Sequence, residues 1–67
     1  MTYEKNILNI RETAKLTRLS VATVYAYVAR RKLPHMKVGA KLLFRRSDLE
    51  DWLDQHRVEP FEKVSQN

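Results

Sequence analysis

The sequence predicts a small, mainly α-helical domain that carries one β-hairpin. Three segments repeat apolar or small residues at helical spacing, and apolar residues flank the single glycine as two strands flank a turn. The chain has 67 residues, enough for one domain with a small core. We expect an N-terminal arm at residues 1–7, a folded domain at residues 8–57 and a flexible tail at residues 58–67.

The first predicted helix covers Ile10–Thr17. Asn9 is a suitable N-cap, and Glu12 lies three residues later, where the partner in a capping box belongs. Positions 10, 13, 14 and 17 recur with the period of one helix face. Because the middle of this face is made of small residues, another helix can approach it closely.

The second predicted helix covers residues 21–32, with Ser20 as its N-cap. Val24 and Val28 are expected to face the core. Three consecutive apolar residues, at positions 26 to 28, cannot all be buried, so one flank of this helix must face something else. Pro34 cannot continue an α-helix, and we expect it to end the segment.

The hairpin is predicted from two short apolar segments, residues 35–38 and residues 42–44, on either side of a turn at Gly39. Two strands of this length are not stable alone, so the hairpin must pack against the helices.

The third predicted helix covers residues 48–57. Ser47 and Glu50 have the spacing of a second capping box. An apolar stripe begins at Leu49 and includes Trp52, which we expect to be a core residue and not a stacking surface.

Two short helices joined by about three residues form a helix-turn-helix, and a basic hairpin follows them. The order of the elements is therefore that of a winged helix-turn-helix with three short helices and a two-stranded wing. In this arrangement the second helix enters the major groove of DNA, where free N–H groups at its start can meet a phosphate. The hairpin tip reaches the backbone or the minor groove.

The charge distribution supports a polyanionic partner. Residues 1–47 hold 11 basic and 2 acidic residues, a net charge of +9, whereas residues 48–67 carry −4. This asymmetry predicts a DNA-binding face that is turned away from the last segment.

Several classes of function are excluded by what the sequence lacks. Without cysteine there is no disulfide, thiol nucleophile or cysteine-based zinc site. His35 and His56 are too far apart to form a paired metal motif, and Gly39 is the only glycine, so there is no nucleotide-binding loop. The longest apolar run has six residues, too few to cross a membrane. We expect no enzymatic activity, cofactor, metal or small-molecule substrate, and a cytoplasmic location.

Five stretches of the chain resemble a known family. They are LNIRETA at residues 8–14, LSVATVY at 19–25, LP at 33–34, KVG at 37–39 and FRRSDLEDWL at 44–53. Their order and spacing resemble those of the small excisionase-type DNA-binding domains, which are related to the N-terminal domain of MerR regulators. The resemblance implies a bacterial, nucleoid-associated protein that directs excision of a mobile element. Its partners would be double-stranded DNA and either an integrase or further copies of itself.

The sequence departs from the family at four positions. Arg18 and Arg31 stand where relatives often have glycine, so both are expected in a left-handed backbone conformation that costs about 1 kcal/mol or more. We hypothesise that phosphate contacts offset this cost. Ala22 and Ala26 stand where relatives often have long polar side chains, which argues against base-specific hydrogen bonds but leaves contact with a thymine methyl group.

The candidate DNA-binding residues fall into two groups. Those on the second helix are Ser20, Val21, Ala22, Thr23, Tyr25, Ala26 and Arg30. Those on the wing and facing the backbone are Arg18, Arg31, Lys32, Lys37, Gly39, Ala40, Lys41, Arg45 and Arg46. One of the last two arginines is expected to face DNA, and the other to pair with an acid of the third helix.

Two alternative functions remain open at this stage. A small transcriptional regulator would use the same DNA-binding surface, although the chain shows no long dimerisation helix of the MerR type. A protein-interaction module would use the acidic residues of the third helix and the tail, where Phe61 lies between Glu59 and Glu62. Convergence of the basic residues with the second helix on one face would favour DNA.

Overall fold

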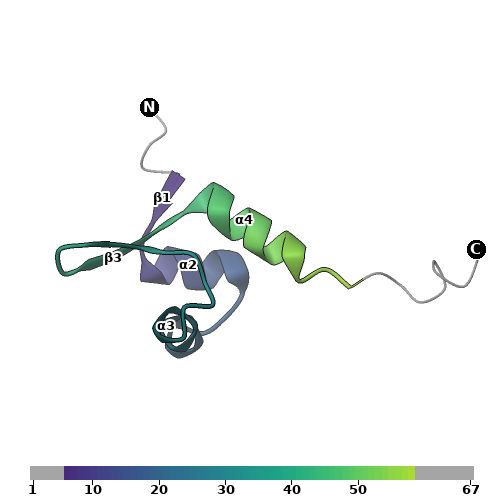
Figure 1. Ribbon diagram of the computed structural model, residues 1–67, viewed down its shortest axis with the longest axis horizontal. Coiled ribbons are helices and arrows are strands. Elements are labelled where there is room, and N and C mark those ends of the chain that lie inside the picture. The colour runs from purple at the N-terminus through teal and green to yellow at the C-terminus, as the bar shows by residue number, and fades with distance from the viewer. Residues whose placement is uncertain (1–5, 59–67) are drawn as a thin grey trace, which may run out of the picture.

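The computed structural model describes residues 6–58, which form three helices and one three-stranded antiparallel sheet (Figure 1). Along the chain these are β1 (Ile7–Leu8), α2 (Ile10–Thr17), α3 (Val21–Ala29), β2 (Met36–Val38), β3 (Lys41–Arg45) and α4 (Arg46–Gln55). The predicted winged helix-turn-helix fold is confirmed. Most of the expected arm and nearly all of the expected tail lie outside the described residues.

Helix α2 has the predicted bounds and the predicted cap. The Asn9 N–H donates to the Glu12 side chain, and the Glu12 N–H donates to the Asn9 side chain, both at 2.8 Å. This reciprocal pair satisfies two N–H groups that a helix start leaves free. Thr13, Ala14 and Thr17 are buried, so the small-residue face of α2 packs inward as expected.

Helix α3 ends at Ala29, and the prediction that it continues to Lys32 was wrong. Arg31 adopts a left-handed conformation, with φ 59°. Its N–H donates to the Val28 carbonyl at 3.0 Å, and the Lys32 N–H donates to the Tyr27 carbonyl at 2.8 Å. These two bonds form a Schellman motif, which closes the helix before Pro34 is reached.

The wing is a tight hairpin with a third strand beside it. Val38 pairs with Lys41, so only Gly39 and Ala40 form the loop, and Gly39 has φ 60°. The short strand β1 pairs with β3 on the other side, which gives the order β1-β3-β2. The sequence analysis did not predict β1, because two residues are too few to show an alternating pattern.

Helix α4 begins two residues earlier than predicted, and the prediction of a capping box at Ser47 was wrong. Arg45 is the N-cap and provides no side-chain hydrogen bond, so Ser47 lies within the first turn. The physical reason lies in the sheet. Arg45 pairs with Ile7, which holds it in the extended conformation that an N-cap requires. The helix ends at Gln55, and the prediction that it extends to Arg57 was also wrong.

The core contains side chains from every part of the fold except β2 and the wing loop. Its buried apolar residues are Leu8, Ala14, Val24, Leu33, Phe44 and Leu49. Trp52 was expected in this core but is only partly buried at its edge. Its indole N–H donates to the Lys32 carbonyl at 2.7 Å, and its ring meets the Tyr27 ring edge-on with the centroids 6.0 Å apart. Trp52 therefore connects α4 to the end of α3.

Candidate nucleic-acid interface

Helix α3 exposes one continuous face. Val24 is fully buried, whereas Val21 and Tyr25 are 37% and 51% exposed. Ala22, Ala26, Ala29 and Arg30 are also exposed. Residues three and four apart lie on the same side of a helix, so these side chains form one outward stripe. The rest of the described chain leaves this face of α3 uncovered.

The start of α3 is closed by two hydroxyl groups that bond to each other. The Ser20 hydroxyl accepts from the Thr23 N–H at 3.1 Å and donates to the Thr23 hydroxyl at 2.9 Å. Ser20 is therefore the N-cap that the sequence predicts. Thr23 is half-buried, and its hydroxyl lies toward the helix start and not on the outward stripe.

The wing meets α3 along an open groove of about 680 Å³. Tyr25 and Ala29 line it from the helix, and Lys37, Ala40 and Lys41 line it from the hairpin. The hairpin extends away from the three helices (Figure 1). The structure thus brings the two wing lysines next to the exposed face of α3, as the sequence analysis required of a DNA-binding surface.

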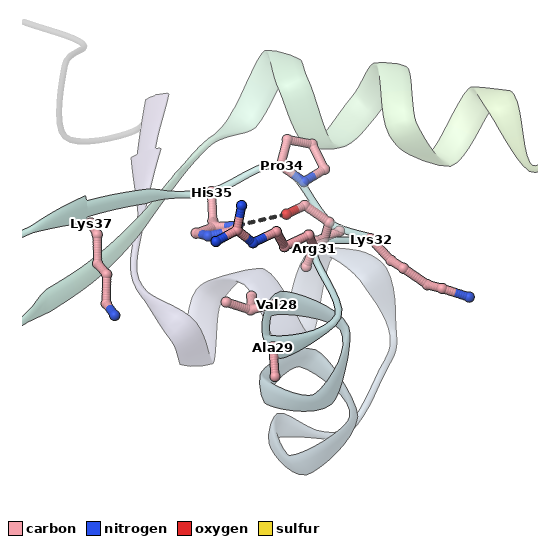
Figure 2. A pocket seen from close by; sticks show the side chains of 8 residues that line it. Val28, Ala29, Arg31, Lys32, Pro34, His35 and Lys37 are labelled. Atoms are coloured by element: carbon pink, nitrogen blue, oxygen red, sulfur yellow. Dashed lines mark hydrogen bonds between the residues drawn. The ribbon is translucent and has the colours of Figure 1, made fainter.

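A second pocket, of about 730 Å³, lies between the end of α3 and β2 (Figure 2). Its charged lining residues are Arg31, Lys32 and Lys37. In Figure 2 the Arg31 side chain runs toward β2, and the Lys32 side chain points the other way. His35 also lines the pocket, and its Nδ1 lies 2.8 Å from the Leu33 carbonyl. Because a carbonyl only accepts, Nδ1 carries the proton of that bond.

Two basic residues near α3 were not predicted. Arg11 and Lys15 are exposed on α2 and share a shallow groove of about 500 Å³ with Val21, at the start of α3. In helix-turn-helix proteins the first helix crosses the DNA backbone. Arg11 and Lys15 are four residues apart beside the buried stripe of α2, and this spacing was the available signal for a basic face. The same spacing is also usual for a solvated helix face.

Arg18 and Arg30 are exposed before the start and after the end of α3, respectively. Arg18 lies in the turn after α2 with φ 63°, so the predicted left-handed conformation is confirmed at Arg18 as it is at Arg31. Arg30 is the C-cap of α3.

Arg45 and Arg46 lie apart from the wing tip. Arg45 is at the other end of β3 from Lys41, about 13 Å away at the usual rise per residue. The Arg45 guanidinium approaches the Asp48 carboxylate at 3.8 Å, and both side chains are about half exposed, so this pair adds little stability. One arginine does pair with an acid of α4, as expected. Neither arginine lines the groove beside α3 or the pocket at its end.

The negative charge of the described chain gathers on α4. Its exposed acids are Asp48, Glu50, Asp51 and Asp54. In Figure 1 α4 and α3 lie on either side of α2, so the helix that carries these acids is on the other side of α2 from α3. Within residues 6–58, no three potential metal ligands form a cluster, and every helix is too short or too polar to traverse a bilayer.

Comparison with known proteins agrees with this geometry. Residues 7–57, more than half of the chain, match the family model described as "Helix-turn-helix domain". Searches of curated proteins and of solved structures give no significant match. The chain belongs to this helix-turn-helix domain family, which includes excisionase-like small DNA-binding domains.

Proposed function

We propose that the chain binds duplex DNA with α3 in the major groove and the β2–β3 wing on the adjacent backbone or minor groove. The observation that carries this proposal is the uncovered face of α3 beside Lys37 and Lys41. The major groove of B-DNA admits an α-helix, and cations beside such a helix meet the phosphates that border the groove.

The roles of the candidate residues follow from their positions. The base-facing group is Val21, Ala22, Tyr25 and Ala26, whereas Ser20 and Thr23, whose hydroxyl groups bond to each other at the helix start, would meet a phosphate. Arg18, Arg30, Arg31, Lys32, Lys37 and Lys41 would meet phosphates. Gly39 and Ala40 form the small tip of the wing, which allows close approach to the duplex. Of the two arginines where β3 joins α4, Arg45 pairs with Asp48, and Arg46 would meet a phosphate beyond the wing.

We propose further that this binding directs excision of a mobile element on the bacterial nucleoid. The five stretches that resemble excisionases support this role. A single module of this kind buries about 600–1,000 Å² on DNA, so one copy binds modestly. Cooperation with an integrase, or with further copies on adjacent sites, would supply the missing affinity.

The test of DNA binding is a titration of short duplexes at several salt concentrations. Neutralising about five phosphates predicts a slope of log affinity against log salt near −4.5. Lys41→Ala should weaken binding to every duplex and flatten this slope by about one unit. Arg57→Ala removes the same charge after the end of α4, outside the groove and the pocket beside α3, and should leave the slope unchanged. No binding at low salt, or a slope near zero, would point instead to a protein partner for the acidic α4.

The biological role is tested by selecting binding sites from random duplexes. Direct repeats of a half-site would support assembly at a recombination site. An inverted repeat would instead favour a transcriptional regulator, because operator symmetry mirrors the symmetry of a dimer.

A further inference from the structure

The pocket between the end of α3 and β2 is lined by basic side chains, and several carbonyl groups around it already accept hydrogen bonds. Helix C-termini normally present free carbonyl groups, which repel anions. Here the Ala26, Tyr27 and Val28 carbonyls accept from the N–H groups of the three residues that close α3. Two of the carbonyl groups that a helix end leaves free, those of Tyr27 and Val28, are therefore satisfied.

The carbonyl groups that follow α3 are also engaged. The Lys32 carbonyl accepts from the indole N–H of Trp52 at 2.7 Å. The Leu33 carbonyl accepts from Nδ1–H of His35 at 2.8 Å (Figure 2). Both bonds come from side chains that are themselves packed in the fold. Three carbonyl groups of the lining, those of Val28, Lys32 and Leu33, are thus occupied, while the two lysines and one arginine of the pocket are donors that cannot accept.

The side chain of Arg31 enters this pocket from a strained position. Its φ of 59° is a conformation that glycine adopts readily, whereas a residue with a side chain adopts it only under strain. Arg31 runs toward β2, where Lys37 borders the same pocket from the wing side (Figure 2). Among residues 6–58 no acidic side chain lines the pocket, and Asp48 and Asp51 border a separate groove that also includes Pro34.

We propose that this pocket holds one phosphate of the DNA backbone between Arg31 and Lys37. The proposal rests on the proposed function and adds a defined contact to it. A phosphodiester is favoured over a free phosphate ion because the pocket is wide and open, and so admits a continuous strand but does not enclose a small ion. Lys37 also borders the groove beside Tyr25, so a strand seated in the pocket passes directly to the base-reading face.

The experiment combines protein variants with single neutral linkages in the DNA. A methylphosphonate is placed at one backbone position at a time in the duplex that the chain binds best. In the wild type, one linkage should weaken binding about fivefold, the upper value for an exposed ion pair. Arg31→Gly removes the cation without adding backbone strain, and in that variant the same linkage should weaken binding clearly less than fivefold, because only the contact with Lys37 remains to be lost. Lys37→Ala should lose the effect of that linkage or of its neighbour.

Arg18→Gly is the matched control, because it makes the same replacement at a left-handed position outside the pocket. It should keep the full effect of the linkage whose effect Arg31→Gly reduces. If every linkage weakens the binding of Arg31→Gly by the same factor as it weakens the binding of the wild type, the pocket holds no phosphate, although DNA binding stands. If the wild type binds no duplex at any salt concentration, the proposed function fails and this inference with it. Saturable binding of inorganic phosphate that Arg31→Gly abolishes would overturn the assignment to a backbone phosphate.

Discussion

Replacing Arg31 by glycine should give a more stable protein than replacing it by alanine. Both replacements remove the same charge, so both lose the same attraction to the negative end of α3. They differ in the backbone. At φ 59° alanine keeps the left-handed strain, about 1–2 kcal/mol, and glycine removes it. Glycine also makes the unfolded chain more flexible, which costs about 0.4–1 kcal/mol.

The difference between these two effects, at the middle of each range, is about 0.8 kcal/mol in favour of glycine. In a domain of this size 1 kcal/mol moves the midpoint of thermal unfolding by about 4–8 °C, so Arg31→Gly should melt about 3–6 °C above Arg31→Ala. The measurement is thermal and urea unfolding followed by far-ultraviolet circular dichroism and by the fluorescence of Trp52, whose agreement checks that unfolding is two-state.

The same comparison at Arg18, where φ is 63°, should give a difference of the same sign and size. An alanine variant as stable as the glycine variant at both positions would refute the reasoning, because the left-handed conformation would then carry no strain. A DNA affinity that differs between Arg31→Gly and Arg31→Ala would show that the backbone, and not the charge, determines binding there.

Three other predictions address the core, the link between α3 and α4, and the bases. Thr13 is fully buried and its hydroxyl has no partner within residues 6–58, so Thr13→Val should stabilise the fold by about 1–3 kcal/mol in urea unfolding. Thr17→Val should not, because the Thr17 hydroxyl donates to the Thr13 carbonyl at 2.8 Å. Trp52→Phe keeps an aromatic ring but loses the bond to the Lys32 carbonyl, and should cost about 1 kcal/mol in the same assay. Replacing thymine by uracil opposite Ala26 removes only a methyl group, and should weaken binding by about 0.8 kcal/mol with an unchanged salt slope; no loss at any thymine would exclude this contact.

The sequence predicted correctly those features that nearby residues specify, such as a helix cap or a buried helix face. Helix α2 has a capping box at Asn9, a regular buried stripe and no competing conformation, and both of its bounds were correct. The exposed face of α3 was also predictable, because too many consecutive apolar residues occupy one helix for all to be buried. In both cases the information lies within a few turns of chain.

Features that depend on distant pairing were missed. Helix α4 begins at Arg46 because β1 holds Arg45 extended, and no residue near Ser47 reports that pairing. The end of α3 is determined by Arg31, which adopts a left-handed conformation that is usual for glycine. Arginine is a common helix residue, so the sequence predicted a longer helix, although the family resemblance indicated the left-handed conformation. The engaged carbonyl groups around the pocket, including the bond from Trp52 to Lys32, require the folded positions of two helices.

The arrangement of charge separates affinity from selectivity in the proposed complex. Helix α3 from Val21 to Ala29 contains no charged side chain, so the residues of the stripe that would face the bases carry no charge that attracts phosphates. The cations lie around it, on the wing and after the end of α3. Removing one of them, as in Lys41→Ala, lowers affinity for all sequences in the same proportion and leaves their ratio unchanged. A change at Ala26 alters only the fit to the base edges, so it should change that ratio while the salt slope stays constant. If the same residues provided both functions, the two quantities would always change together.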